Sequence, residues 1–124
     1  MKFTIPIKPR TKKNHGQIIT MKNGRQIMLP SKEYKEFEKE VINFVESNFG
    51  NLEPIERDIN LCCHFYKEKD FKADLTGYLQ AIQDALVKAG LLKDDNHKIV
   101  RTTNGSEVFL DRNNPRIEIE ITFY

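Results

Sequence analysis

The amino-acid sequence predicts an α+β fold: a single domain spanning residues 1–124, with a mixed β-sheet that includes hairpins and with two main helices. Three observations support this prediction. Two segments carry apolar residues at helical spacing, several others are β-prone or alternate apolar and polar residues, and turn-forming residues separate them. A chain of 124 residues buries roughly two thirds of its unfolded surface, so its core needs no disulfide or metal in order to fold.

The first third of the chain predicts three strands. Apolar residues alternate over residues 3–7, and a basic loop follows over residues 8–14. The β-prone residues 17–21 and 25–29 then flank Asn23-Gly24. Because Asn-Gly is a preferred pair in tight hairpin turns, these two segments are expected to pair with each other.

Two longer segments predict amphipathic helices. The first begins after Ser31, a residue suited to an N-cap, and ends at Gly50. The second begins at Asp74 and ends at Gly90, which readily adopts the left-handed conformation that closes a helix. Each carries apolar residues three and four positions apart: Tyr34, Phe37, Val41, Phe44 and Val45 in the first, and Leu75, Leu79, Ile82, Leu86 and Ala89 in the second.

The remaining segments predict strands. Residues 59–66 and 116–124 alternate apolar and polar side chains, which indicates that each strand buries one face. Residues 98–103 and 107–110 flank Asn104-Gly105 and are expected to form a second hairpin. The resulting order, βββαβαβββ, with two helices available to cover one face, is typical of an α+β domain with a mixed sheet.

Composition excludes several protein classes. Hydrophobic residues make up 39% of the chain, charged residues 31%, and the mean hydropathy is −0.58, which argues against membrane and disordered proteins. The chain has no apolar run of bilayer length and no signal-peptide pattern, so a cytoplasmic location without a membrane partner is expected. Cys62 and Cys63 are adjacent in a predicted strand, where neighbouring side chains point to opposite faces, so no bridge between them is expected.

The formal net charge of +2 combines two unlike parts of the chain. Residues 1–32 carry eight Lys or Arg and no Asp or Glu, whereas residues 33–124 carry twelve basic and eighteen acidic side chains, so charges of +8 and −6 make up the total. A basic arm on an acidic body indicates an anionic partner for the first segment and a separate role for some of the acids. A basic surface that is merely solvated is the alternative.

The informative acidic residues flank the second predicted helix: Asp70 and Asp74 precede it, and Asp94 and Asp95 follow it. The chain has no glycine-rich phosphate loop, no Cys or His pair at zinc-ligand spacing and no G-x-S-x-G motif. Carboxylates without such partners suit Mg²⁺, with Mn²⁺ as a substitute. These ions typically act in phosphodiester hydrolysis, so the acids predict hydrolytic chemistry on nucleic acid.

The length of the second helix is an objection to a metal shared across it. A helix over residues 75–89 spans roughly 22 Å, so Asp74 and Asp95 can meet only if the loop after Gly90 folds back or another strand brings Asp95 toward the helix start. The acids also have structural interpretations: Asp74 as an N-cap, Asp94 and Asp95 as turn residues, Asp70 as a solvated charge, and Asp84 as part of the exposed helix face.

Residues 74–95, DLTGYLQAIQDALVKAGLLKDD, resemble the signature of RusA-type Holliday junction resolvases, the crossover junction endodeoxyribonucleases that are common in prophages. The family pattern is D-x-D-N-x-x-K, followed by D-A-L, A-G and D-D at the offsets found here. The rest of the chain resembles the family more weakly, through an N-terminal strand, a Pro- and Lys-rich loop ending at Asn14, a hairpin and a helix. A RusA-like fold is therefore expected over the whole chain.

This resemblance implies a homodimeric, magnesium-dependent endonuclease that resolves four-way DNA junctions by paired symmetric nicks in recombination and repair. Asp74 matches the first acid of D-x-D-N and Asp95 matches the second acid of D-D. Both are implied to be catalytic and to bind the metal, and Asp94 is a weaker catalytic candidate. A dimer suits the reaction, because two symmetric cuts need two identical sites.

Three positions depart from the family pattern: Thr76 stands in place of the second Asp, Gly77 of the Asn and Gln80 of the Lys. Thr76 offers only a neutral hydroxyl, so the metal is expected to bind more weakly unless Asp94 or Asp70 substitutes. Gln80 supplies no cation, a role that can pass to nearby basic residues. The candidates for DNA contact are Arg10, Lys12, Lys13 and Asn14 in the basic loop, and Lys69 and Lys72 before the second helix.

The sequence leaves two other functions open. A non-catalytic DNA-binding protein of the same fold would keep the basic arm, and the departures at Thr76, Gly77 and Gln80 would then record the loss of its metal site. A structural or interaction protein would instead use the acidic body to bind a basic partner. Metal-dependent nicking separates an enzyme from the first alternative, and DNA binding separates it from the second.

Overall fold

The computed structural model of the protein describes residues 1–12, 17–29 and 31–124. The described residues form strands and helices in the order that the sequence predicts, βββαβαβββ. The elements are β1 (Lys2–Ile5), β2 (Gln17–Thr20), β3 (Gln26–Leu29), α1 (Lys32–Phe49), β4 (Ile59–Lys67), α2 (Leu75–Lys88), β5 (Val100–Thr102), β6 (Glu107–Leu110) and β7 (Arg116–Phe123).

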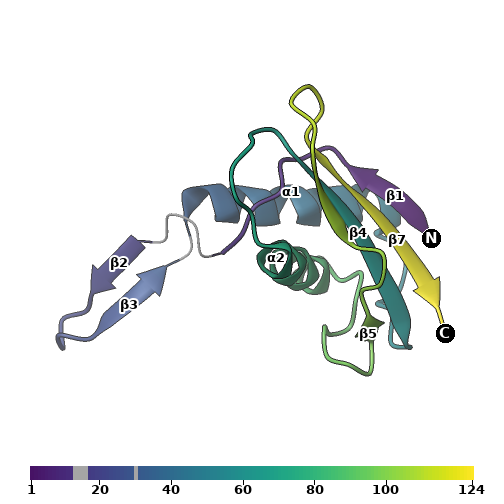
Figure 1. The fold of residues 1–124 in the computed structure, drawn as a ribbon. Coiled ribbons are helices and arrows are strands. Elements are labelled where there is room, and N and C mark those ends of the chain that lie inside the picture. The colour runs from purple at the N-terminus through teal and green to yellow at the C-terminus, as the bar shows by residue number, and fades with distance from the viewer. Residues whose placement is uncertain (13–16, 30) are drawn as a thin grey trace.

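The main sheet is mixed, as predicted. Strand β7 lies between β1 and β4 and pairs antiparallel with both, and β5 and β6 pair in parallel with the other edge of β4 (Figure 1). Strands β2 and β3 pair with each other in the predicted hairpin and, among the described residues, with no other strand. Antiparallel neighbours on one edge of β4 and parallel ones on the other make this an α+β fold.

The second predicted hairpin, around Asn104-Gly105, is wrong. Strands β5 and β6 do not pair with each other, because both continue the same edge beside β4. The side chain of Asn60 holds the segment between them: its Oδ1 accepts the backbone N–H of Asn104 at 2.8 Å, and its Nδ2 donates to the carbonyl of Asn104 at 3.1 Å. Gly105 adopts a positive φ of 89°. Asn-Gly therefore interrupts an edge strand here, as a bulge does, instead of reversing the chain.

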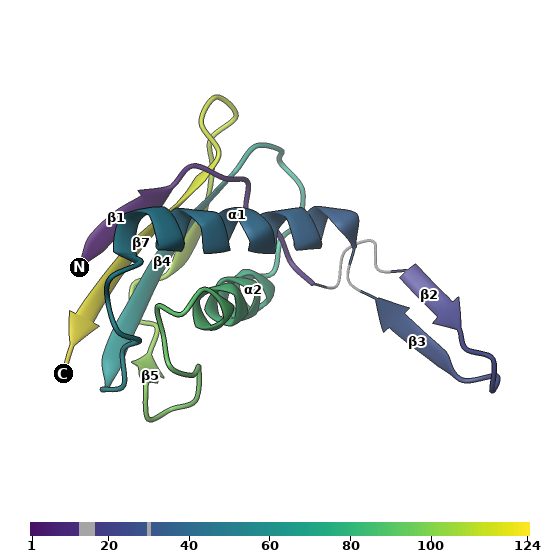
Figure 2. The same cartoon turned by 180° about the vertical axis from the view of Figure 1, so that it is seen from behind.

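Both helices lie on one side of the main sheet, as Figures 1 and 2 show from opposite directions. Alternate residues of β4 and β7 face them and are buried, as the period of two predicts. Cys63 is buried on that inner side, whereas Cys62 is half-buried on the outer side, and both are free thiols. The core consists of the inner residues of the sheet together with Tyr34, Phe37, Val41 and Val45 from α1 and Tyr78, Ala81, Ile82, Ala85 and Leu86 from α2.

The helix ends follow the predicted capping residues. The Ser31 hydroxyl accepts the backbone N–H of Tyr34 at 3.1 Å and caps α1, which ends before Gly50. Asp74 caps α2, and Gly90, with a φ of 83°, follows the C-cap residue Ala89. Within the part of the chain described here, neither helix has an apolar stretch long enough to cross a bilayer.

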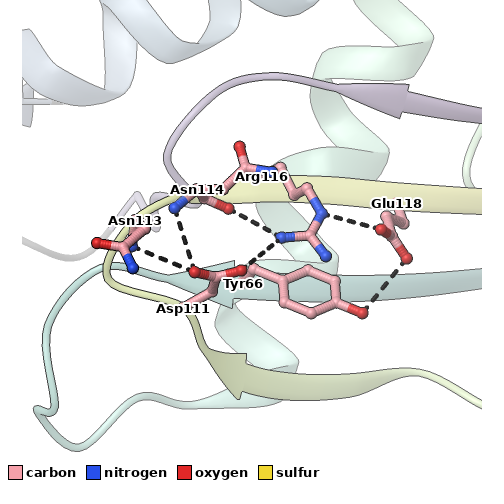
Figure 3. Close-up of polar contacts among 6 residues, drawn as sticks. All are labelled: Tyr66, Asp111, Asn113, Asn114, Arg116 and Glu118. Atoms are coloured by element: carbon pink, nitrogen blue, oxygen red, sulfur yellow. Dashed lines mark hydrogen bonds and ion pairs between the residues drawn. The ribbon is translucent and has the colours of Figure 1, made fainter.

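The outer face of the sheet carries a network of polar contacts around Arg116 (Figure 3). The guanidinium pairs with Asp111 and Glu118, each at 2.9 Å, and lies 3.7 Å from the centre of the Tyr66 ring. The Tyr66 hydroxyl donates to Glu118 at 3.3 Å. Hydrogen bonds from Arg116 hold the pKa values of both carboxyls below their ordinary values. This network ties β4, β7 and the loop between β6 and β7 together.

Replacing Arg116 with methionine is expected to lower the free energy of unfolding at pH 7 and to weaken its dependence on pH. Because Asp111 and Glu118 have lowered pKa values in the folded protein, their ionised forms stabilise the fold above the ordinary values of 3.8 and 4.5. That stabilisation is lost as the pH falls through the lowered values. Urea unfolding at pH 7 and at about pH 2 measures this effect, and the difference between wild type and variant should shrink at the lower pH.

The matched control is Arg101→Met. Arg101 also pairs with a carboxylate, Asp58 at 3.5 Å, and also lies over a ring, that of Tyr124, but the paired side chains are 57% and 48% exposed. Solvent screens such a pair, so a much smaller change is expected. An Arg116 variant whose loss of stability is as large at pH 2 as at pH 7 would contradict the electrostatic explanation.

Candidate functional site

Two carboxylates eleven positions apart in the sequence, those of Asp84 and Asp95, influence each other beside α2. Asp84 belongs to the helix, and after Gly90 the chain turns back, so that the carboxyl of Asp84 is close enough to raise the pKa of Asp95. The backbone N–H groups of Leu91 and Leu92, both buried, donate to the carbonyl of Leu86 at 3.0 and 3.4 Å and anchor this return. The loop after Gly90 therefore folds back, which is one of the two conditions given above for Asp95 to meet Asp74.

The electrostatics of this pair disfavour two negative charges. Partial burial raises the pKa of Asp95 above its ordinary value, and the neighbouring carboxyls of Asp84 and Asp94 raise it further. Asp94 shows the opposite behaviour: it accepts the backbone N–H of Asp95 at 2.7 Å and the side-chain amide of Asn96 at 3.1 Å, which lowers its pKa. A cation placed between Asp84 and Asp95 would relieve their repulsion.

Lys12 places a cation beside one of these carboxylates, that of Asp84. Its ammonium pairs with the carboxylate of Asp84 and also lies 5.7 Å from the centre of the Tyr34 ring. The side chain of Asp84 is 22% exposed, so it is half-buried on the helix surface beside Lys12. Asp84 lies two turns beyond Gly77 on the same helix face, and Thr11 packs against Gly77 there. Thr11 and Lys12 of the basic loop therefore lie against the face of α2 that carries Asp84.

Asp74 lies at the other end of this face. It caps α2, and its Oδ1 accepts the backbone N–H of Thr76 at 3.1 Å. Ten residues separate Asp74 from Asp84, which corresponds to about 15 Å along the helix axis. The carboxylate adjacent to Asp95 is therefore Asp84, and the binding of one metal by Asp74 and Asp95 stays a prediction.

The weaker candidates are all on the surface. Thr76 and Gln80 are exposed on α2, and Asp70 is 75% exposed and pairs with Lys67 at 3.9 Å. Among residues 1–12, 17–29 and 31–124, no three His, Cys, Asp or Glu side chains are grouped so that they could hold a metal ion. A divalent ion at Asp84 and Asp95 would take its other ligands from water or substrate. Mg²⁺ fits this donor set, since it commonly uses one or two carboxylates together with waters and phosphate oxygens.

A basic groove of about 620 Å³ lies near the start of α2. We call it the basic groove; its charged residues are Lys8, Arg10, Lys67, Lys69 and Lys72 with Glu33 and Glu68, and its other residues are Pro9, Thr11, Ser31, Phe71 and Tyr78. Five cations against two carboxylates leave a net positive charge. The groove joins the N-terminal loop to the segment between β4 and α2, which brings together basic residues about sixty positions apart in the sequence.

Not all of this charge is available to a ligand. Lys8 pairs with Glu68 at 3.0 Å and lowers the pKa of that carboxyl, and Lys67 is occupied by Asp70, the Phe71 carbonyl and the Phe71 ring. Arg10, Lys69 and Lys72 form no ion pair with any residue in the described ranges. These three predicted DNA-contacting residues therefore carry the excess positive charge of the groove.

The other predicted DNA-contacting residues are not among these three groove residues. Lys12 pairs with Asp84 and does not line the groove, and Lys13 and Asn14 fall outside the described residues. Sequence reasoning missed Lys8 and Lys67 as groove residues and Asp84 as the neighbour of Asp95. The sequence signal that could have identified Asp84 is the D-A-L part of the signature, in which Asp84 is the aspartate.

Comparison with known proteins places these residues in a family. The model of the family described as RusA, endodeoxyribonuclease RusA, matches residues 6–122 of the 124. This match covers the basic groove, the carboxylate pair and all elements from α1 to β6. Among curated proteins, none matches the chain.

Proposed function

Because the chain belongs to the RusA endodeoxyribonuclease family, we propose that it resolves four-way DNA junctions by magnesium-dependent nicking of two opposed strands. The family itself implies an endodeoxyribonuclease acting in Holliday junction resolution. The single observation that carries the finer proposal is geometric: the basic groove, with its excess positive charge, lies near the start of α2, the helix that bears Asp74 and Asp84. An anionic backbone and a divalent cation are the ligands that such neighbouring surfaces suit.

The basic groove would bind and orient the DNA backbone. Arg10, Lys69 and Lys72 can each contact a phosphate, and such contacts position a duplex without reading its sequence. The exposed ring of Phe71 offers an apolar surface beside these cations. Recognition of a junction by its shape is consistent with a groove of this kind, because four-way junctions differ from linear duplexes in the paths of their backbones.

The carboxylates would hold the metal. Asp95 is the candidate that both the family signature and the raised pKa support, and Asp84 is the neighbour that supplies a second oxygen ligand. Asp74 stays a predicted ligand and catalytic residue, with Asp94 as a weaker catalytic candidate. A bound Mg²⁺ would activate water and stabilise the negative charge that develops on the phosphate.

The departures from the family pattern bear on the strength of this site. Thr76 is exposed and uncharged, so the chain offers fewer carboxylates at the helix start than the pattern contains. Asp84, the acid of the D-A-L part of the pattern, is kept farther along the same helix. The family pattern has a lysine at the position of Gln80. Lys12, which pairs with Asp84, is the cation best placed to take over the role of that lysine.

A homodimer would complete the activity. One chain supplies one site, whereas resolution of a junction needs two cuts related by symmetry, which a two-fold dimer provides. Because the proposed substrate is recombining DNA, including that of a prophage, the cytoplasm stays the predicted location. Recombination and repair are the processes in which such a substrate arises.

Incubation of the purified protein with a fluorescently labelled synthetic four-way junction tests the proposal. Paired, symmetric nicks are expected with Mg²⁺ or Mn²⁺ and none with EDTA. A linear duplex of the same sequence serves as the control substrate and should stay intact. Failure to nick the junction with either metal would overturn the enzyme assignment, and equal cleavage of the linear duplex would overturn the selectivity for junctions.

A further inference from the structure

The hairpin of β2 and β3 extends away from the rest of the molecule, as Figures 1 and 2 both show. Its strands pair over four residues each, and a tight turn closes it: Met21 N–H donates to the Arg25 carbonyl at 2.7 Å, and Gly24 N–H donates to the Met21 carbonyl at 2.9 Å. Gly24 has a φ of 83°, which this turn requires. Isolated two-stranded hairpins are only marginally stable in water, so this ribbon is suited to stabilisation by a partner.

The tip of the hairpin carries the features of a nucleic-acid contact. Lys22 and Arg25 are exposed there, and neither forms an ion pair within the described part of the chain. No Asp or Glu occurs anywhere in residues 1–32. Met21, next to these cations, is 46% exposed. The positive charge of Lys22 and Arg25 is complementary to a polyanion and would repel a basic partner.

The hairpin is also continuous with the basic groove. Residues Lys8, Arg10 and Thr11, which lead into the hairpin, form one part of the groove lining, and Ser31 and Glu33, which follow the hairpin, form another. A DNA backbone held by the groove would therefore lie next to the base of the ribbon. The hairpin would then extend along, or into a groove of, the same duplex arm of the junction.

We propose that the β2–β3 hairpin is a second DNA-contacting element, which enters the major groove of a duplex arm whose backbone lies in the basic groove. The major groove is wide enough to admit a two-stranded ribbon, and Lys and Arg side chains can contact phosphates or base edges there. This inference rests on the proposed function, because it takes branched DNA as the ligand of the groove. It assigns DNA contact to Lys22 and Arg25, outside the signature region.

Fluorescence anisotropy of a labelled four-way junction, measured in EDTA over a range of salt concentrations, tests whether the charges of the hairpin contact DNA. Lys22→Ala with Arg25→Ala is expected to weaken binding about tenfold and to reduce the slope of log affinity against log salt by about 1.8, the value for two lost phosphate contacts. The matched control, Lys35→Ala with Lys39→Ala, removes two exposed cations from α1 and should change affinity by less than about twofold. Equal effects of the two double variants would overturn the proposal.

Hydrogen exchange of the wild type locates the contact. Backbone amides of residues 17–29 should exchange more slowly when the junction is added, because DNA stabilises the ribbon. Unchanged exchange there on saturation with DNA would overturn the proposal, as would protection that appears without DNA when the protein concentration is raised, since that would identify a second copy as the occupant. These binding measurements are made in EDTA and do not depend on cleavage. A wild type that binds the junction but does not nick it with Mg²⁺ or Mn²⁺ would therefore refute the resolvase assignment and leave the test of the hairpin intact.

Discussion

Asp95→Asn is expected to reduce metal-dependent nicking of a four-way junction by about a hundredfold or more. The substitution keeps the size of the side chain but removes the charge that would hold Mg²⁺ beside Asp84. Losses of this size are typical when one group that stabilises the developing charge is removed. Single-turnover cleavage with saturating enzyme measures the chemical step separately from DNA binding.

Loss of folding does not explain such a result. Because the pKa of Asp95 is raised in the folded protein, its ionised form is disfavoured there, and stability falls as the pH rises through that value. Removing the charge at pH 7 is therefore not expected to lower the free energy of unfolding. A variant that is inactive but at least as stable as the wild type would locate the defect in the chemistry.

Two further variants show which carboxylates share the metal. If the ion lies between Asp84 and Asp95, Asp84→Asn should lose as much nicking activity as Asp95→Asn. If Asp74 at the start of α2 is also a metal ligand, Asp74→Asn should lose as much activity as Asp95→Asn. Asparagine is also a good N-cap residue, so Asp74→Asn preserves the cap of α2. Asp58→Asn is the control, because Asp58 pairs with Arg101 outside this region and its loss should leave nicking unchanged. Full activity of Asp95→Asn would contradict the assignment of the site.

The second large effect concerns the basic groove. Replacing Arg10, Lys69 and Lys72 together with alanine is expected to weaken junction binding by roughly tenfold to a hundredfold at moderate salt. Each lost phosphate contact reduces the slope of log affinity against log salt by about 0.9, so the slope should fall by about 2.7. The measurement is equilibrium binding in EDTA at several salt concentrations.

Equal removal of charge elsewhere is the control for this result. Lys2, Lys35 and Lys39 are exposed outside the groove, and their joint replacement with alanine removes the same three charges. A change in slope as large as that of the groove variant would mean that only net charge matters. A groove variant with wild-type affinity and slope would instead show that the DNA backbone binds elsewhere.

Much of the fold could be predicted because local patterns determine it. Ser31, Asp74 and Gly90 mark helix ends through their own hydrogen bonds and backbone conformations, and these need no distant partner. The hairpin at Asn23-Gly24 is likewise local. The same dipeptide at Asn104-Gly105 misled, because Asn60, forty-four residues earlier, holds that segment against β4.

The candidate site divides in the same way. The helix, its capping aspartate, the charge asymmetry and the family signature can all be recognised from the amino-acid sequence, because each depends on residue type and spacing within short segments. It took the three-dimensional fold to show that Asp95 lies near Asp84, that Lys12 pairs with Asp84, and that Arg10 joins Lys69 and Lys72 in one groove. These contacts depend on how loops return across a packed helix, and that path is set by the burial of Leu91 and Leu92 and by the packing of Thr11 on Gly77.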